Sequence, residues 1–320
     1  MSKTALLFAG QGAQVVGMGK DLAEHSPSAK AWFDRANAAL GYDLTTICFS
    51  GPEPELTKTE HAQPGIFLVS WAAFELLKER VPSLSFQATA GLSLGEFTAL
   101  TAAGAMSFEE GLKVVRQRGL FMQEACAATQ GGMAAIIGLG EAATREVCAE
   151  AGVVLANLNC PGQIVISGAS EKMAPACALA KAKGAMRALR LPVAGAYHSP
   201  LMASAQPKLE AELARVALVP PTVPVIANVT AQPHEGPDAI RARLVEQVTS
   251  SVRWEESMRY LVAQDFTRFI ELGPGRALSG FMKRIDKTVQ ILNVEDVASL
   301  EATAKALANQ GDVAADVSRR

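Results

Sequence analysis

Short runs of apolar residues alternate along this 320-residue chain with longer segments in which apolar residues recur at helical spacing. A short apolar run is typical of a buried strand, and a spacing of three to four residues is typical of one helix face. The run at 4–9 predicts a first strand, which ends at the tight turn Gly-Gln-Gly at 10–12. Segments 21–40 and 65–78 have helical spacing. This alternation predicts an α/β fold.

The second predicted strand is followed by a short segment bounded by glycines. We expect a strand at 87–90, then the segment from Gly91 to Gly95, then a helix to about residue 103. The next predicted helix covers 108–127. The predicted elements of the C-terminal part are a helix at 199–216, strands at 224–228 and 267–272, and a helix that opens at 273–275.

The pattern between residues 130 and 194 differs from the rest. Its elements follow in the order βαββαβ, which is the order of a ferredoxin-like unit. The predicted strands are 131–138, 153–158, 163–167 and 187–191, and the predicted helices are 142–151 and 171–183. We therefore predict an α/β-hydrolase-like large domain with a mostly parallel sheet, formed by 1–129 and 195–320. An inserted ferredoxin-like small subdomain is predicted at 130–194.

Composition and charge narrow the class of protein. Apolar residues make up 49% and charged residues 19%, which is ordinary for a globular enzyme. Lys and Arg number 30 against 32 Asp and Glu, and no basic run stands out, so we expect no nucleic-acid binding. The longest apolar run, 65–77, is interrupted by Ser70 and Glu75 and is too short to cross a bilayer. We therefore expect no membrane span.

The cysteines and the first residues indicate a cytoplasmic protein. The chain has five cysteines, an odd number, and no CxxC pair, which is typical of reduced and mostly buried thiols. The residues after Met1 do not form a signal peptide. No coiled-coil heptad or apolar stripe indicates an oligomer, so we expect a monomer.

Ser93 is the first candidate for chemistry. Gly91–Gly95 reads G-x-S-x-G, the pattern of a nucleophile elbow, in which a serine is held on a sharp turn between a strand and a helix. The glycines leave room for that backbone, and the N–H of Leu94 points to where an oxyanion would form. The alternative interpretation is an ordinary glycine-bounded turn.

A nucleophilic serine needs a base, and the chain has four histidines. His25 and His234 lie in polar stretches and are predicted to be solvated loop residues, and His61 is predicted to lie on the surface. His198 follows a predicted strand and precedes a predicted helix, which is where α/β enzymes place catalytic groups. The residues alone leave open whether His198 is catalytic or structural. No Asp or Glu is an obvious third member of a triad.

Arg118 lies on the apolar stripe of the predicted 108–127 helix, four residues after Val114. A guanidinium cannot lose its proton to escape burial, so it needs an anion. The functional interpretation is a bidentate clamp on a substrate carboxylate. The alternatives are an ion pair with a nearby carboxylate or a side chain that reaches solvent.

Cofactor motifs are incomplete. The turn at 10–12 lacks the third glycine of a dinucleotide fingerprint, because Val15 stands in its place. No phosphate-binding loop and no metal-ligand spacing occurs in the sequence. We therefore expect chemistry without a cofactor or a metal.

Seven motifs occur in one collinear order that resembles the malonyl-CoA:acyl carrier protein transacylases, the loading enzymes of type II fatty acid synthesis. The resemblance covers residues from about 4 to 300. The motifs are Phe-Ala-Gly-Gln-Gly-Ala-Gln at 8–14, Gly-Leu-Ser-Leu-Gly-Glu at 91–96, Gln-Arg-Gly at 117–119, Gly-Met-Ala-Ala-Ile at 132–136, Asn-Cys-Pro-Gly-Gln at 159–163, Tyr-His-Ser-Pro-Leu-Met at 197–202 and Glu-Leu-Gly-Pro-Gly at 271–275.

The resemblance implies a role for each matching residue. Ser93 would be the nucleophile that becomes malonylated, His198 the general base and acid, and Arg118 the group that binds the malonyl carboxylate. The backbone N–H groups of Gln11 and Leu94 would form the oxyanion hole. The family orients its histidine with a main-chain carbonyl, and here that carbonyl would belong to Gln247.

Three positions depart from the usual pattern of the family. Leu92 replaces the more common His before the nucleophile, so any tuning by that His is absent. Ala9 stands where the family often has Pro. Tyr197 precedes the histidine where malonyl-specific relatives usually have Phe or Ser, which bears on the selectivity between malonyl and methyl-branched substrates.

The resemblance implies transfer of a malonyl group from malonyl-CoA to the phosphopantetheine thiol of acyl carrier protein, through a malonyl-serine intermediate. The partners would be malonyl-CoA and acyl carrier protein. The first alternative is an acyltransferase of the same fold that loads polyketide synthase carriers in trans. The others are a serine thioesterase and an inactive scaffold that binds carrier protein.

Overall fold

The larger of two sheets has five parallel strands in the order β7-β2-β1-β8-β9. The computed structural model describes residues 2–317. The strands are β1 (Lys3–Phe8), β2 (Ala88–Gly91), β7 (Val225–Ile226), β8 (Phe266–Leu272) and β9 (Gln290–Val294). The predicted mostly parallel sheet is confirmed. Strand β9 was not predicted, because its residues are only half-buried and form no continuous apolar run.

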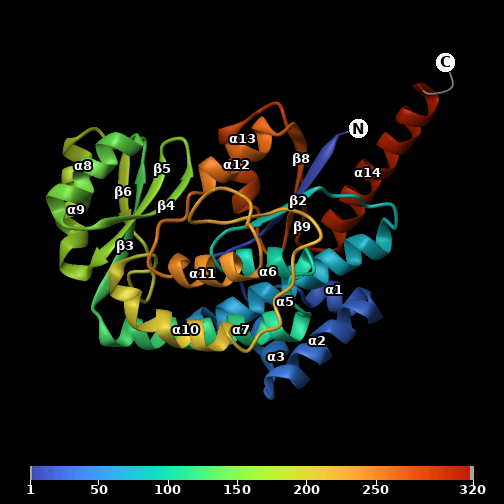
Figure 1. Ribbon diagram of the computed structural model, residues 1–320, viewed down its shortest axis with the longest axis horizontal. Helices are drawn as coiled ribbons and strands as arrows, with labels where there is room; N and C mark the ends of the chain where they lie inside the picture. Colours follow the sequence, from blue (N-terminus) through green and yellow to red (C-terminus); the bar gives the residue numbers. More distant parts are fainter. Residues whose placement is uncertain (1, 318–320) are drawn as a thin grey trace.

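Strand β1 lies at the centre of this sheet, and its apolar run is buried on both faces. Leu6 and Phe8 pack into one cluster with α5 (Thr59–Arg80), α6 (Leu94–Ala102) and α7 (Phe108–Ala128). Ala5 and Leu7 pack into another cluster with α12 (Trp254–Ala263) and α13 (Ala277–Ile285). Successive side chains of a strand point to opposite faces of the sheet. Because helices cover both faces here, every position of the run is buried, which explains why the whole run is apolar. Figure 1 shows the two sets of helices on either side of the strands.

The predicted helix at 21–40 is two helices in the structure, α1 (Lys20–His25) and α2 (Pro27–Leu40). Ser26 separates them, and its side chain accepts a hydrogen bond from the Ala29 N–H. A serine N-cap followed by proline at the first helical position starts a new helix. The helical spacing of apolar residues continues across this break, so the spacing alone predicted a single helix. The helices α3 (Leu44–Ser50), α4 (Glu53–Thr57) and α14 (Val297–Val317) were not predicted.

The predicted helix at 199–216 begins as a 3₁₀ turn, η1 (Pro200–Ala205), and continues as α10 (Gln206–Leu213). The connection from β7 to β8 contains α11 (Pro237–Gln247) and α12, which were also not predicted. The carboxyl end of α11 places Gln247 beside the elbow, as described below.

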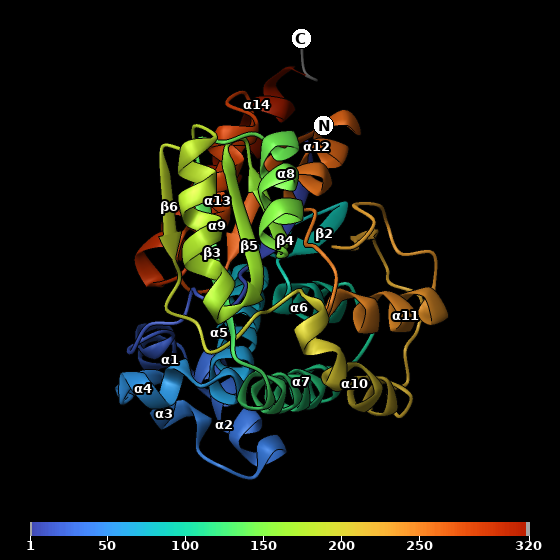
Figure 2. The ribbon, with the colours of Figure 1, turned by 90° about the vertical axis from the view of Figure 1, so that its left-hand side faces the viewer.

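The smaller sheet has four antiparallel strands in the order β4-β5-β3-β6. Its helices α8 (Glu141–Ala151) and α9 (Ser170–Ala182) lie on one face of the sheet, and a separate apolar cluster fills the space between them (Figure 2). The strands are β3 (Gly131–Ile137), β4 (Val154–Cys160), β5 (Gln163–Ala169) and β6 (Arg187–Arg190). The predicted βαββαβ order and ferredoxin-like arrangement are confirmed. Within the described residues, no helix is both long and apolar enough to cross a membrane.

Candidate active site

Ser93 occupies a strained turn between β2 and α6. Its backbone has φ 55° and ψ −108°, a region that residues with a side chain rarely adopt. The two flanking glycines make the turn possible. A Cβ on Gly91 would lie 1.9 Å from the carbonyl carbon of Gly95, and a Cβ on Gly95 would lie 2.2 Å from the Phe8 oxygen. The segment is therefore a nucleophile elbow in its geometry as well as in its sequence.

Asn228 holds the elbow from the side. Its Oδ1 accepts a hydrogen bond from the Ser93 N–H at 2.6 Å, and its Nδ2 donates to the Gly91 carbonyl at 2.7 Å. The side chain is buried, so both bonds form away from water. Sequence reasoning missed Asn228, because an asparagine after a short apolar run carries no pattern of its own.

His198 contacts the serine hydroxyl. Its Nε2 is 2.9 Å from Ser93 Oγ, and its Nδ1 is 2.9 Å from the main-chain oxygen of Gln247. A carbonyl oxygen can only accept, so Nδ1 carries the proton and Nε2 is free to accept the serine proton. Burial, together with the nearby charge of Arg118, lowers the pKa of His198 to about 4. The imidazole is therefore neutral at pH 7, as a general base requires.

Arg118 reaches the same hydroxyl from α7 with a fully buried guanidinium. Its Nη2 donates to Ser93 Oγ at 3.1 Å and to Gln247 Oε1 at 2.9 Å, and its Nη1 donates to Gln63 Oε1 at 2.6 Å. Burial lowers the pKa of Arg118 to about 10, against the opposing effect of Glu96, so the group is charged at pH 7.

The two structural explanations for Arg118 do not fit these surroundings. Among the described residues, no carboxylate oxygen lies within ion-pair distance of its nitrogens, and its side chain is only 1% exposed. Its Nε is buried and donates to no group in the part of the chain that the structure describes. A buried cation with an unused donor keeps hydrogen-bonding capacity for an external anion.

Gln247 connects these groups. Its main-chain oxygen bonds His198, and its side-chain Oε1 accepts from Arg118. Its Nε2 donates to the Ser93 carbonyl at 3.0 Å and to Glu96 Oε2 at 2.7 Å. The structure therefore brings Ser93, His198, Arg118 and Gln247 into one hydrogen-bonded cluster, although His198 and Gln247 are more than 100 residues from Ser93 in sequence.

The other two predicted residues flank the elbow. Leu94 is the first residue of α6, where backbone N–H groups have no partner within the helix. Gln11 follows β1, and the turn that carries it lies against the elbow: a Cβ on Gly10 would be 2.4 Å from the Leu92 oxygen. The Gln11 side chain bonds Gln63 and Tyr197 rather than the serine.

The prediction for His234 was wrong. Its side chain is fully buried, and its Nε2 is 2.8 Å from Glu96 Oε1. The polar neighbours of His234 in sequence suggested solvent. The loop after β7 instead folds back, with the His234 N–H bonded to the Val225 oxygen, so the ring points into the molecule. Sequence reasoning also missed Glu96 and Gln63 as parts of the site.

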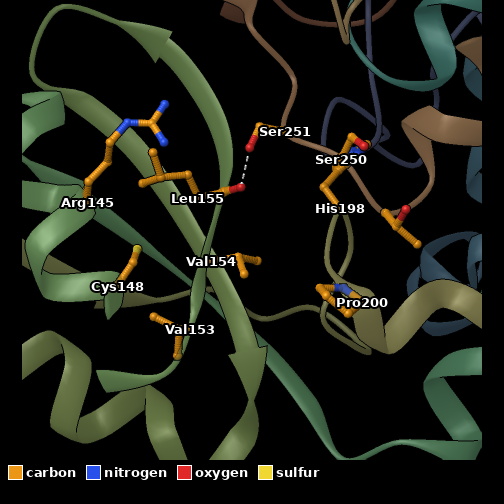
Figure 3. Close-up of a pocket in the computed structure, with 10 residues that line it drawn as sticks. Arg145, Cys148, Val153, Val154, Leu155, His198, Pro200, Ser250 and Ser251 are labelled. Carbon is orange, nitrogen blue, oxygen red and sulfur yellow. Dashed lines mark hydrogen bonds between the residues drawn. The ribbon is translucent and has the colours of Figure 1, made fainter. Parts of the chain in front are cut away.

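A cavity of about 460 Å³ opens beside His198. One wall is formed by β4 of the smaller sheet and by the helix α8 that packs on that sheet. The other wall is formed by His198, Pro200 and residues 249–251 (Figure 3). Ser251 ties the two walls together through a 2.6 Å hydrogen bond to the Leu155 oxygen. Among residues 2–308, whose side chains the structure describes, no group of three or more His, Cys, Asp or Glu side chains gathers as a metal site would require.

Comparison with known proteins places this geometry in a family. Residues 5–315 match the acyl transferase domain. The chain is 45% identical over 317 residues to the malonyl CoA-acyl carrier protein transacylase of Bacillus subtilis, covering 98% of this chain and 99% of the relative. Two solved structures are also similar. The malonyl CoA-acyl carrier protein transacylase of Clostridium perfringens has a TM-score of 0.93 at 39% identity, covering 98% of this chain and 99% of its own.

The second solved structure is a malonyl-transacylase in complex with a type II polyketide synthase acyl carrier protein. It has a TM-score of 0.92 at 38% identity and covers 95% of this chain and 100% of that one. The family match spans nearly the whole chain, and the relatives are covered over almost their full length. The chain therefore belongs to the acyl transferase family, in the group of malonyl CoA-acyl carrier protein transacylases.

Proposed function

We propose that this enzyme transfers the malonyl group of malonyl-CoA to the phosphopantetheine thiol of acyl carrier protein through a malonyl-Ser93 intermediate, and so supplies extender units for fatty acid synthesis. One observation carries the proposal: Ser93 Oγ contacts both a neutral histidine and a buried arginine that has no carboxylate partner among the described side chains. The histidine suits nucleophilic catalysis, and the arginine suits a substrate with a free carboxylate.

In the first half-reaction, Ser93 Oγ attacks the thioester carbonyl while its proton passes to His198 Nε2. The tetrahedral intermediate collapses, its carbon–sulfur bond breaks, and the departing CoA sulfur takes the proton from His198. In the second half-reaction the carrier thiol gives its proton to His198 and its sulfur attacks the malonyl-serine ester. The bond between the acyl carbon and Ser93 Oγ breaks as the tetrahedral intermediate collapses, which leaves the malonyl group on the carrier sulfur. Ser93 then recovers its proton, so the enzyme returns to its starting state.

The oxyanion of each tetrahedral intermediate would be bound by the N–H groups of Leu94 and Gln11. The position of Leu94 at the start of α6 supports this role, because a helix N-terminus favours negative charge. Loss of one such donor costs about 3 kcal/mol of transition-state stabilisation in comparable sites.

Arg118 would bind the malonyl carboxylate. Its Nε is unpaired, and its Nη2 already touches the nucleophile, so a carboxylate on the guanidinium would lie next to Ser93. Gln247 would orient His198 through its main-chain oxygen, in the place where a triad has an acid. A carbonyl fixes the tautomer as an acid does but carries no full negative charge.

The cavity beside His198 would admit the pantetheine arm of either substrate. It lies between the smaller sheet and the rest of the chain, which supports a division into a small subdomain of residues 130–194 and a large one of 1–129 and 195–320. We further propose that the enzyme is a cytoplasmic monomer that binds neither nucleic acid nor membrane. Five buried, unpaired cysteines support a reducing compartment, and light scattering would test the monomer.

A polyketide carrier is the second candidate acceptor, because a similar structure contains a malonyl-transacylase bound to such a carrier. Both acceptors present the same phosphopantetheine thiol, so the active site does not distinguish them. Competition between a fatty acid carrier and a polyketide carrier for the malonyl-enzyme would decide.

The test of the proposed function is intact mass spectrometry after brief exposure to malonyl-CoA without carrier. We expect a single malonyl adduct that maps to Ser93 and is absent from Ser93→Ala. Adding holo-carrier should remove the adduct and increase the carrier mass by one malonyl group. CoA release without an adduct or a carrier product would indicate a thioesterase instead. An adduct retained in Ser93→Ala would rule out Ser93 as the nucleophile.

A further inference from the structure

The mechanism leaves two buried, ionisable side chains unused, Glu96 and His234. Both side chains have 0% exposure. Glu96 lies in the first turn of α6, three residues after Ser93, and His234 lies on the loop after β7. Burial of a carboxylate is costly unless its oxygens are fully hydrogen-bonded. The groups that donate hydrogen bonds to Glu96 therefore indicate which parts of the site this side chain positions.

Each oxygen of Glu96 has a separate set of donors. Oε2 accepts from the Asn228 N–H at 3.0 Å and from Gln247 Nε2 at 2.7 Å, and Oε1 is 2.8 Å from His234 Nε2. A serine followed three residues later by glutamate usually forms a capping box at a helix start. Here no side-chain cap forms, because Ser93 faces His198 and Glu96 faces Gln247.

The carboxylate, together with the Ser93 carbonyl, selects one orientation of the Gln247 amide. A carboxylate only accepts hydrogen bonds, so the amide must turn its Nε2 toward Glu96 and its Oε1 toward Arg118 Nη2. In the flipped orientation the amide oxygen would face the carboxylate and the amide nitrogen would face the guanidinium. The main-chain carbonyl of the same residue, Gln247, binds His198.

His234 in turn fixes the carboxylate. Its ring is buried with Nδ1 unpaired, so the bond to Glu96 Oε1 is the only polar contact of the ring among the residues that the structure describes. That bond stops the carboxylate from rotating away from Gln247. The Asn228 that donates to Oε2 through its backbone also holds the elbow through its side chain, so the whole network ends at Ser93.

We propose that Glu96 and His234 are positioning residues, which hold the Gln247 amide in the orientation that supports Arg118 as the malonyl carboxylate clamp. The inference rests on the proposed function. It predicts that disturbing the pair impairs malonyl transfer more than acetyl transfer, because an acetyl group has no carboxylate for Arg118 to bind.

The first test compares His234→Leu with His234→Gln. Leucine fills a similar volume but donates no hydrogen bond, whereas the glutamine amide can donate to Glu96 in place of the imidazole Nε2. We expect His234→Leu to lower the ratio of kcat/KM for malonyl-CoA to that for acetyl-CoA by about tenfold, the scale of one lost hydrogen bond to a charged group. His234→Gln should restore the ratio to within about threefold of the original.

The second test compares Glu96→Gln with Glu271→Gln. Glu271 is a matched control, because it is also a buried carboxylate, but it binds the N–H groups of Leu278 and Ser279 at the start of α13. A carboxamide at position 96 can both donate and accept, so it no longer selects one orientation of Gln247. We expect the malonyl-to-acetyl ratio to fall in Glu96→Gln and to stay unchanged in Glu271→Gln.

The outcomes separate three explanations. If Glu96 acted only as a negative charge near Arg118, its removal would strengthen malonyl binding and raise the ratio, which would overturn the proposal. Equal losses for both thioesters, or a lower melting temperature alone, would indicate a purely structural role and overturn it too. If His234→Leu does not fold, the malonyl-to-acetyl ratio of the isosteric variant Glu96→Gln decides whether the proposal holds. No malonyl adduct on the unmodified enzyme would overturn the proposed function and this inference with it, whereas an adduct with unchanged ratios overturns the inference alone.

Discussion

The environment of His198 predicts that acylation persists at unusually low pH. Burial beside the Arg118 guanidinium lowers the pKa of this histidine to about 4. At pH 5 a histidine with the ordinary value near 6.5 would be only about 3% neutral, whereas one with a pKa of about 4 would be about 90% neutral. Only the neutral ring accepts the Ser93 proton, so the two cases differ by about thirtyfold in acylation rate at pH 5.

The assay is rapid-quench formation of the acyl-enzyme at pH 5 to 8, under kcat/KM conditions that report the free enzyme. Malonyl-pantetheine is the suitable substrate, because it lacks the nucleotide phosphates of CoA that titrate near this range. Circular dichroism at each pH shows that the enzyme remains folded. We expect the rate to change by less than about twofold between pH 7 and pH 5. A rate that falls below one tenth by pH 5, with the fold intact, would refute the reasoning from burial.

The remaining predictions concern selectivity, the elbow and stability. Arg118→Ala should lower the malonyl-to-acetyl ratio of kcat/KM by about 10- to 100-fold, the scale of a hydrogen bond to a charged group, and an unchanged ratio in a competition assay would exclude the clamp. Gly91→Ala should destabilise the fold by about 3 kcal/mol or more in urea, because its Cβ would lie 1.9 Å from Gly95 carbon. Gly280→Ala, with open space around its Cβ, should be neutral or stabilising by up to about 1 kcal/mol, so equal losses in both variants would contradict the steric argument. The unfolded chain binds the His198 proton below pH 6.5 and the folded chain only below about pH 4, so stability is lost as pH falls through this window. Between pH 7.5 and pH 4.5 the original enzyme should lose about 2.5 kcal/mol more than His198→Gln in urea unfolding, and parallel losses would contradict the low pKa.

The sequence by itself determined the fold class, because continuous apolar runs such as the one in β1 form only where both faces of a strand are buried. It also determined the elbow. The spacing of Gly91, Ser93 and Gly95 is a local steric requirement, because a Cβ on Gly91 would lie 1.9 Å from the Gly95 carbonyl carbon and a Cβ on Gly95 would lie 2.2 Å from the Phe8 oxygen. The apolar stripe of the predicted 108–127 helix made Arg118 a candidate, the resemblance to a family assigned its role and added Gln247, and the structure places both residues against Ser93 or its histidine.

The supporting network was decided only by the tertiary structure. Asn228, His234 and Gln247 lie in the connection between β7 and α12, whose one helix, α11, has a weak apolar pattern and was not predicted. Their contacts with Ser93 and Glu96 cross 132 to 154 residues of sequence. The polar neighbours of His234 indicated solvent, but burial depends on what packs against a loop. No local sequence pattern predicts the burial of such a loop or its hydrogen bonds to distant segments, because both depend on how the chain packs around the sheet.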